Sequence, residues 1–366
     1  MKGLKIGDVL NLLEEWAPLN YQENYDNSGL VIGNKDDVCT GVLCALDVTE
    51  AIINEAIQQS CNLIIAHHPL IFSPLKKITS ATWIERCVVK AIKNNINIYA
   101  LHTNADNIIT GVNHTIAKKL NLTKLRILQP KNKILKKLVS FVPMSHIDSV
   151  RQALFNAGCG HIGNYDSCSF STTGAGTFRG NQHSNPFIGE KEKLSEENEV
   201  RIETIFESHK EKKVITALLN THPYEEVAYD IYQLDNYYNN VGSGMIGELE
   251  TAISVKDFLK KIKEVFKAEC VRYTDYNKPI KKVAFCGGSG SFLLSQAIVS
   301  EADVFLSSDF KYHQFFDADN KLLITDIGHF EAEQYTPEIF CALIQKKFPT
   351  FAVHLSKINT NPVKYF

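Results

Sequence analysis

Short runs of apolar residues that alternate with helical segments constrain the fold of this 366-residue chain most strongly. In its first third, the runs 41–46, 63–66 and 96–101 carry almost no polar residue, and helical patterns over 49–59 and 83–93 separate them. A strand that is apolar on both sides has to be buried on both faces, which is typical of parallel sheets. The pattern therefore predicts an α/β fold whose sheet carries helices on both faces.

The same order of elements returns near the other end of the chain. Apolar strands are expected over 282–286, 303–306 and 322–325, with a helix over 292–299 between the first two. Identity between the two halves is weak, so the repeat is inferred from the pattern alone. We interpret it as one pseudo-duplicated sheet, to which each half of the chain contributes strands.

The middle of the chain has a different pattern. Two strand–helix–strand units are expected in series, over 136–142, 146–157, 167–172, 201–206, 209–220 and 227–234. This order predicts a small ferredoxin-like α+β domain inserted into the main one. The glycine-rich segment Val241-Gly242-Ser243-Gly244 is expected to be the return linker. We therefore expect a discontinuous metal-binding α/β domain over 1–128 and 242–366, with an inserted domain over 129–241; the length of the chain suits two domains.

Composition excludes several classes of protein. A formal net charge of −2 and a pI near 6.6 do not provide the basic surface on which nucleic-acid binding depends. The sequence has no apolar stretch of about eighteen residues, and its start does not resemble an export signal. The nine cysteines are scattered singly, without a Cys-x-x-Cys pair, which is typical of reduced cytosolic thiols. We expect a cytoplasmic protein with no membrane or nucleic-acid partner.

Polar side chains follow the predicted strands, where parallel sheets bind their ligands. His67 and His68 come directly after the strand 63–66, and Asp106 follows the next strand closely. Adjacent side chains on an extended backbone point to opposite sides, so the histidine pair suits two neighbouring ions better than one. His329 and Glu333 are one helical turn apart and can converge on one ion. These five residues predict a two-metal site.

The types of these side chains restrict the metal. Three imidazoles and two carboxylates suit zinc, iron, manganese or cobalt, and the absence of thiolates argues against a structural zinc site. A carboxylate that bridges two ions, with a position left for water, is the usual catalytic arrangement. A single histidine after a strand is commonly just a polar surface residue. The histidine pair together with a carboxylate and a His-x-x-x-Glu motif is harder to explain in that way. We expect two divalent ions, zinc first, with iron or manganese as alternatives.

Other residues near the strand ends have two interpretations each. His102 either orients a metal ligand or is a buried histidine of the core. The segment Gly287-Gly288-Ser289-Gly290 either forms a plain tight turn or binds an anion with its backbone amides at a helix N-terminus. Asp309 and His313 are expected to face the same cleft as the histidine pair, where they position substrate or act as acid and base; a plain surface role is the alternative.

The motifs of the two outer segments, roughly 1–128 and 242–366, resemble those of the Nif-three-like dinuclear metal-centre family. Bacterial members of that family are commonly named GTP cyclohydrolase 1 type 2 homologues. The resemblance rests on Asp26-Asn27-Ser28-Gly29-Leu30, Ile65-Ala66-His67-His68-Pro69, Leu101-His102-Thr103-Asn104-Ala105-Asp106, Gly287-Gly288-Ser289-Gly290, Asp326-Ile327-Gly328-His329 with Glu333, and Thr360-Asn361-Pro362.

The resemblance implies more than the residues themselves do. It implies that His67, His68, Asp106, His329 and Glu333 ligate two ions, with Glu333 in contact with both. It also implies a toroidal homohexamer and an inserted domain similar to the PII and CutA proteins. One departure is Ser308, which stands before Asp309 where the family motif begins Gly-Asp.

We hypothesise a dinuclear-metal-dependent hydrolase that acts on a small molecule. Ring opening of GTP, a nucleotide, by a metal-activated hydroxide is the named candidate reaction. A metal-dependent phosphoester hydrolase is the enzymatic alternative, because two-metal sites recur in phosphatases and nucleases. A non-catalytic metal-binding or regulatory scaffold is the alternative outside enzymes. A near-neutral chain with one glycine segment provides little evidence for a triphosphate site.

Overall fold

The computed structural model describes residues 3–366, which form two compact units. The main unit comprises Met1–Pro130 and Asn239–Phe366, and the insert comprises Lys131–Tyr238. Each unit has its own hydrophobic core, as the burial of Phe305 in the main unit and of Leu154 in the insert illustrates. The chain is thus a mixed α/β protein whose main unit is discontinuous in sequence.

The first sheet of the main unit has five strands in the order β1-β4-β3-β2-β15. Strands β15, β2, β3 and β4 are parallel, and β1 at the edge is antiparallel to β4. The predicted buried strands are confirmed, since every residue of β2, β3 and β4 is buried. The strands are β1 (Gly29–Ile32), β2 (Val42–Ala45), β3 (Leu63–Ala66), β4 (Asn97–Ala100) and β15 (Val353–Leu355).

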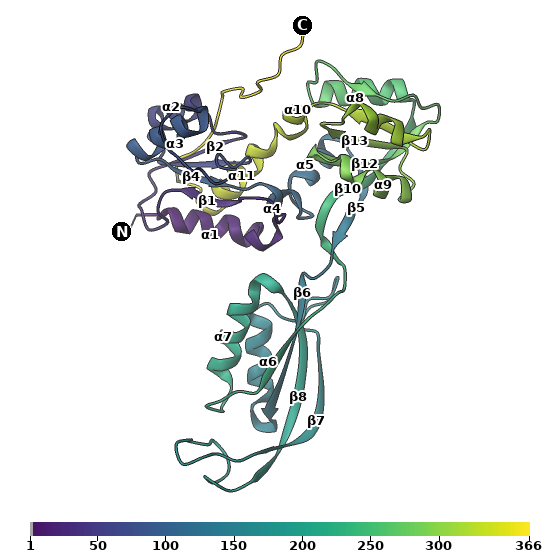
Figure 1. Cartoon of the computed structure of the whole chain (residues 1–366). Coiled ribbons are helices and arrows are strands. Elements are labelled where there is room, and N and C mark those ends of the chain that lie inside the picture. Colours follow the sequence, from purple (N-terminus) through teal and green to yellow (C-terminus); the bar gives the residue numbers. More distant parts are fainter. Residues whose placement is uncertain (1–2) are drawn as a thin grey trace. The chain divides into compact units, whose positions relative to one another are not determined.

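Helices cover both faces of this sheet (Figure 1). Helices α2 (Glu50–Gln58) and α3 (Trp83–Lys93) pack together on one face, whereas α1 (Ile6–Trp16) and α11 (Thr336–Lys347) pack on the other. Threonine side chains fix where α2 and α3 begin. The hydroxyl oxygens of Thr49 and Thr82 accept hydrogen bonds from backbone amides of the first turn, which would otherwise have no partner.

The second sheet of the main unit has six strands in the order β11-β14-β13-β12-β10-β5. Its centre is parallel, from β12 through β13 to β14. Alternate residues of β13 enter two different cores, with Val304 and Leu306 on one face and Phe305 on the other. The strands are β5 (Thr123–Lys131), β10 (Tyr238–Ile253), β11 (Arg272–Tyr273), β12 (Ile280–Ser289), β13 (Val304–Ser308) and β14 (Leu323–Asp326). Three helices supply residues to the cores on the two faces of this sheet: α5 (Val112–Leu120), α8 (Val255–Val265) and α9 (Leu294–Val299).

The prediction of one pseudo-duplicated sheet is wrong, because the two halves form separate sheets. Both halves do contain the expected strand–helix–strand order with polar residues at the strand ends. The C-terminal segment also returns to the first sheet through α11 and the three-residue strand β15. Periodicity describes each strand singly, and it contains no information about which strands pair.

The insert contains one antiparallel sheet in the order β7-β8-β6-β9 and two helices that pack on each other. Its core includes Leu138, Leu154 and Leu218. The predicted order of six elements is confirmed: β6 (Leu135–Pro143), α6 (Ile147–Asn156), β7 (Ser169–Phe178), β8 (Ser195–Glu207), α7 (Glu211–Thr221) and β9 (Tyr229–Gln233).

The segment Val241-Gly242-Ser243-Gly244 lies just after the insert ends at Tyr238, as predicted for the return to the main unit, but it is part of strand β10 and not a separate linker. A Cβ atom on Gly242 would lie 2.1 Å from the carbonyl oxygen of Gln129. Glycine is therefore needed here because another backbone segment approaches closely, as glycines inside strands often indicate.

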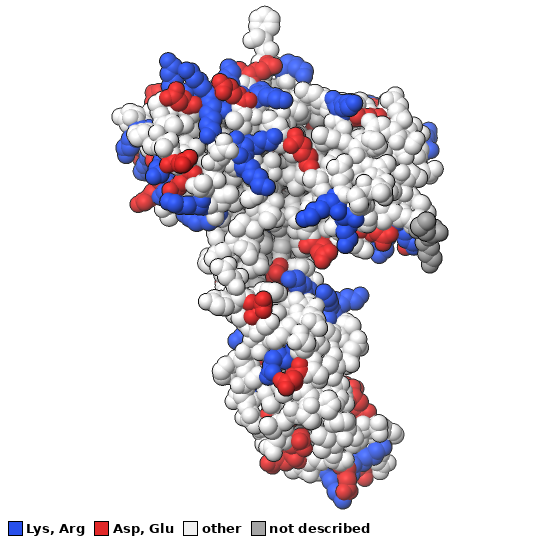
Figure 2. Space-filling view, turned by 180° about the vertical axis from the view of Figure 1, so that it is seen from behind, with Lys and Arg blue, Asp and Glu red and all other residues white. Residues whose placement is uncertain are grey.

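The surface of the molecule mixes charges of both signs. On the face shown in Figure 2, lysine and arginine side chains are interspersed with aspartate and glutamate. This agrees with the net charge of −2 and does not resemble a continuous basic surface. Within residues 3–366, we find no helix of the length and apolarity that crossing a bilayer requires.

Separate cores predict separate responses to mutation. Leu154 is fully buried in the insert, so Leu154→Ala should destabilise the insert by about 2–5 kcal/mol through lost burial and the cavity left behind. If the main unit binds metal as the sequence predicts, its metal content should stay unchanged. Chemical denaturation followed by circular dichroism, with metal analysis of the folded protein, measures both. Loss of bound metal in a folded Leu154→Ala protein would contradict two independent cores.

Candidate metal centre

The ends of three elements of the main unit, β3, α4 and α10, bring the five predicted ligands together. His67 and His68 follow strand β3, and Asp106 ends the short helix α4 (Thr103–Asp106) that follows β4. Strands β3 and β4 are parallel neighbours, so their carboxyl ends lie side by side. His329 begins the short helix α10 (His329–Glu333), and Glu333 ends it. The spacing of four residues places both side chains on one side of that helix.

The carboxylate of Glu333 lies at the centre of this cluster and is 3% exposed. Its Oε1 atom is 3.6 Å from Nε2 of His67, while its Oε2 atom is 3.0 Å from Nε2 of both His68 and His329. Two groups of potential metal ligands result, and they share this one carboxylate. The first group is His67, Asp106 and Glu333; the second is His68, His329 and Glu333.

Two buried atoms of the first group show that a metal ion fits this site. Nε2 of His67 and Oδ1 of Asp106 are 3.7 Å apart, and neither has a hydrogen-bond partner within the part of the chain that the structure describes. Leaving a buried polar atom unpaired costs about 1–3 kcal/mol, so native proteins rarely do so without a reason. A cation between these atoms would remove that cost, and the nitrogen and oxygen donors are those that first-row divalent metals accept.

The three histidines of the two groups are held in the same way. Nδ1 of His67 donates to the carbonyl oxygen of Leu101 at 2.7 Å. Nδ1 of His68 lies 2.7 Å from Oδ1 of Asp47, and Nδ1 of His329 lies 2.6 Å from Oδ2 of Asp309. Because Nδ1 of each ring is engaged in these contacts, Nε2 is the nitrogen that faces Glu333 and that a metal ion would use. Such contacts orient metal-binding histidines and fix their tautomer.

Burial and neighbouring charges shift the pKa of each of these groups. Burial lowers the pKa of His67. Burial also opposes a charge on His68 and His329, but the carboxylates around them outweigh it and raise their pKa values to about 9 and about 11. Burial, together with the nearby Glu333 carboxylate, raises the pKa of Asp106. Without metal, protons on His68 and His329 balance the negative charge of the site.

His102 lies beside the cluster and is not a core histidine. Its ring centroid is 5.3 Å from that of His67, and it offers a nitrogen within 4.8 Å of donor atoms on His67 and His68. Nδ1 of His102 is 2.7 Å from Oδ1 of Asp26, and the other oxygen of Asp26 accepts from the amide and hydroxyl of Thr103. Burial of the Asp26 carboxyl raises its pKa, but the hydrogen bonds from His102 and Thr103 outweigh burial, so the pKa of Asp26 is lowered.

The glycine segment makes room for the central carboxylate. Gly287 and Gly288 lie in strand β12, so the expected turn directly after the strand is wrong for them. Gly288 has φ +62°, and a Cβ atom there would lie 2.3 Å from Oε1 of Glu333. Ser289 ends the strand, and Gly290 precedes a short 3₁₀ turn and the six-residue helix α9; anion binding by this segment stays a prediction. Close approach to Glu333 is thus the structural reason for glycine at position 288.

Asp309 and His313 were predicted to face one cleft, and the structure separates them. Asp309 contacts His329 and lies beside the metal centre, where its role is to orient that histidine. His313 is exposed on the 3₁₀ helix η5 (Tyr312–Ala318), where its ring contacts Tyr312 and Phe316. It lines neither of the two cavities that open beside the centre. The sequence pattern does not indicate that the backbone turns at Asp309, with φ +60°, and directs the following residues away from the centre.

Sequence reasoning missed two carboxylates that hold the histidines. Asp47 lies two residues after the end of the apolar strand β2, so its position near a strand end was an available signal. Asp26 lies in the turn cluster before β1, and only the fold reveals that it reaches His102. Thr360, in the C-terminal segment, donates a hydrogen bond to Oδ2 of Asp47 and so supports this carboxylate in turn.

Two cavities give access to the centre. One of about 200 Å³ is lined by Tyr25, His102, Asp106, Phe292, His329 and Glu333, among others. The other, of about 410 Å³, is lined by residues that include Asp47, His68, Arg272, Asp309, His329 and Tyr365. Arg272 already pairs with the buried carboxylate of Asp326 and donates to the carbonyl oxygen of Phe310. A small molecule can therefore reach the ligand set from either side of His329.

Comparison with known proteins places this arrangement in a family. The sequence profile of the Duf34/NIF3 (NGG1p interacting factor 3) family matches residues 4–362. The chain belongs to the Duf34/NIF3 family. It is 40% identical to a protein of Halalkalibacterium halodurans and 38% identical to one of Bacillus subtilis, in each case over 364 residues, which is 98% of this chain. The matches cover 98% and 97% of those two proteins, both of which are named GTP cyclohydrolase 1 type 2 homolog.

A solved structure shows the same fold. The crystal structure of a NIF3-related protein from Bacillus cereus superposes with a TM-score of 0.87 at 38% identity, and the match covers 100% of both chains. The predicted resemblance to the Nif-three-like family is confirmed. The names of these Duf34/NIF3 relatives describe homology to an enzyme and do not establish an activity. The chemistry of this chain depends on its own residues.

Replacement of Gly288 by alanine tests the packing at the centre. The added Cβ would displace the carboxylate of Glu333 and would force alanine into a left-handed backbone conformation. We expect Gly288→Ala to lower metal affinity by about 10–100-fold, the range found when the support of metal ligands is disturbed. Titration against a chelating dye measures it. Gly174→Ala is the matched control, because no atom lies within 4 Å of a Cβ there. Equal affinity of both variants would contradict this account.

Metal affinity should rise with pH. The raised pKa values of His68, about 9, and His329, about 11, mean that both carry a proton at neutral pH without metal. A binding ion has to displace these protons, so each proton released strengthens apparent affinity by roughly tenfold per pH unit. Dye competition at pH 6, 7 and 8 should show this increase. Affinity that is independent of pH over this range would show that no proton is displaced.

Proposed function

We propose that this member of the Duf34/NIF3 family is a dinuclear-metal-dependent hydrolase. The observation that carries the proposal is the shared carboxylate: the two oxygens of Glu333 face two different sets of donors, with an open cavity beside them. His67, His68, Asp106, His329 and Glu333 would hold the two ions. Zinc is proposed first, with iron or manganese as alternatives, because the donor set is mixed imidazole and carboxylate.

Different residues of the chain would serve different parts of the proposed hydrolysis. Two divalent ions, when bound, activate water and polarise the bond under attack. Burial of His67 and Glu333 keeps solvent away from one side of the centre, so that attack occurs from the cavity side. Asp47, Asp309 and the carbonyl of Leu101 hold the three imidazoles in place. A fixed ligand set keeps its geometry as charge develops during the reaction.

A proton has to reach the leaving group, and His102 is positioned to supply it. It lines the 200 Å³ cavity together with Asp106 and Glu333, and its Nδ1 is held by Asp26. An imidazole whose one nitrogen is held by a carboxylate can exchange a proton through the other. We therefore propose His102 for the acid–base role that the sequence suggested for Asp309 and His313.

The cavities favour a small substrate of low negative charge. Among the described residues that line the 200 Å³ cavity we find no lysine or arginine, and Arg272 in the other cavity is already paired. Recognition of a triphosphate ordinarily uses several unpaired cations. Ring opening of GTP stays a candidate through the names of the relatives. Phosphoester hydrolysis is the second candidate, because a carboxylate shared by two metal-ligand groups is typical of two-metal phosphatases.

Three further proposals concern the whole protein. The insert is proposed to be a ferredoxin-like domain, which its β-α-β-β-α-β order and strand order β7-β8-β6-β9 support. The chain is proposed to assemble as a toroidal homohexamer, for which light scattering of the purified protein is the test. A cytoplasmic location is proposed because all nine cysteines are free thiols.

Removal of the shared carboxylate should abolish hydrolysis. We expect Glu333→Gln and His68→Ala each to lower turnover by more than about 100-fold and to lose bound metal, since both disrupt the ligand set. His313→Ala is the matched control, because His313 is exposed and lines neither cavity. Metal content by mass spectrometry, GTP consumption by chromatography and p-nitrophenyl phosphate hydrolysis by absorbance provide the readouts.

The outcomes separate the candidate functions. A formamidopyrimidine product that disappears in Glu333→Gln supports ring opening of GTP. Release of p-nitrophenol that depends on the same residue supports a phosphoester hydrolase and rules out ring opening as the main reaction. Full occupancy by two ions without turnover of any substrate would contradict the hydrolase and favour a metal-binding scaffold.

A further inference from the structure

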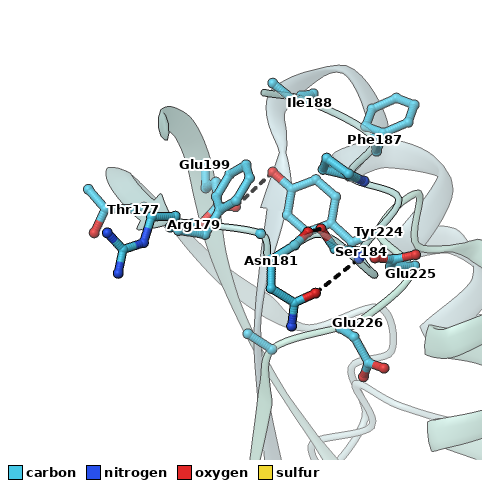
Figure 3. Close-up of a pocket in the computed structure, with 15 residues that line it drawn as sticks. Thr177, Arg179, Asn181, Ser184, Phe187, Ile188, Glu199, Tyr224, Glu225 and Glu226 are labelled. Atoms are coloured by element: carbon cyan, nitrogen blue, oxygen red, sulfur yellow. Dashed lines mark hydrogen bonds between the residues drawn. The ribbon is translucent and has the colours of Figure 1, made fainter. Parts of the chain in front are cut away.

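The insert contains a cavity of about 390 Å³ that lies wholly within that unit (Figure 3). The end of β7, the segment 179–188, the beginning of β8 and the turn around Tyr224 form its walls. Its volume is in the range of sites that bind small molecules, which is about 300–1,000 Å³. The cavity has no role in the metal chemistry proposed above.

Aromatic rings form much of the wall. The ring of Tyr224 lies 6.1 Å from that of Phe178 and 6.3 Å from that of Phe187, measured between centroids. Pro186 and Ile188 add apolar surface. In Figure 3 the tyrosine ring lies in the middle of the drawn side chains, between Glu199 on one side and Phe187 on the other. Such rings present electron-rich faces that attract cations.

A buried carboxylate accompanies these rings. Glu199 is 9% exposed, and its Oε1 atom accepts a hydrogen bond of 2.9 Å from the hydroxyl of Tyr224. Within residues 3–366 we find no ion pair and no further side-chain hydrogen bond at Glu199; the histidine that is influenced by its charge is His222, whose pKa burial lowers. Gly176 leaves the space that this side chain needs, because a Cβ there would lie 2.2 Å from Oε2. Buried carboxylates are ordinarily paired with a cation, so Glu199 lacks its usual partner.

The other charged residues around the cavity favour a positive ligand. Glu225 and Glu226 add two carboxylates, and Oε1 of Glu225 accepts from the backbone amide of Asn185. Arg179 also lines the cavity, but in Figure 3 its guanidinium points away from Tyr224 and Glu225. The carboxylate of Glu226 also points away from Tyr224 in Figure 3, so an anion would meet Glu199 and Glu225, and a cation would gain from both.

We propose that this cavity of the insert binds a protonated alkylamine. The ammonium group would donate a hydrogen bond to Oε2 of Glu199 and lie against the face of Tyr224, while its alkyl chain packs on Phe178 and Phe187. The carboxylates exclude phosphates and other anions from the same space. This site is independent of the proposed hydrolase activity, since every residue that forms it belongs to the insert.

Calorimetric titration of the full chain with putrescine and spermidine tests the proposal. The neutral isostere 1,4-butanediol has the carbon chain of putrescine without its charge, and inorganic phosphate probes anion binding. We expect at least one amine to bind at least about tenfold more tightly than the diol, because charge-assisted bonds and cation–π contacts need the ammonium. No heat change is expected with phosphate in the insert.

Variants locate the binding. Glu199→Gln keeps the shape and should weaken amine binding by at least about tenfold, whereas Tyr224→Phe keeps the ring and should weaken it less. Glu196→Gln is the matched control, because Glu196 is an exposed carboxylate of the same strand outside the cavity. Comparison of amine with diol in the unmodified protein provides the result even if a variant does not fold. Equal binding of amine and diol, no amine binding, or full affinity in a folded Glu199→Gln protein would overturn the proposal.

Discussion

The buried carboxylate of Glu333 is the constraint on which the main unit depends. One of its oxygens faces His67 and the other faces His68 and His329, so residues separated by more than half of the chain meet at a single group. The surrounding fold accommodates it: Gly288 lacks a side chain there, and helix α10 is placed to direct the carboxylate inward. A buried carboxylate among imidazoles and beside unpaired polar atoms is costly without cations, which relates the architecture to metal binding.

The residues that hold the candidate ligand histidines lie at neighbouring strand ends, which explains why the sequence motifs around the centre are long. Each ligand histidine needs a second contact at Nδ1, and these contacts come from Leu101, Asp47 and Asp309 on three different strand ends. The C-terminal tail adds Thr360, which donates to Asp47. Hydrogen bonds therefore connect the tail to Asp47 and, through Asp47, to the candidate ligand His68.

Local features of the chain were predictable, and pairing was not. Runs of buried residues such as Leu63–Ala66 and the spacing of His329 and Glu333 indicate strands and a convergent pair directly, because burial and helical periodicity act on neighbours in sequence. The division into two sheets depends on long-range pairing, as does the return of Val353–Leu355 to the first sheet. The glycines at 242 and 288 resemble linker and turn signals, yet they mark close approach of distant segments.

Glu333 is proposed to join two metal ions in one site. Anomalous diffraction from crystals of the metal-loaded protein, recorded at the zinc, iron and manganese edges, tests it most directly. Two peaks are expected, one beside each oxygen of Glu333, the first in contact with His67 and Asp106 and the second with His68 and His329. A single peak, or an ion that does not contact Glu333, would contradict it.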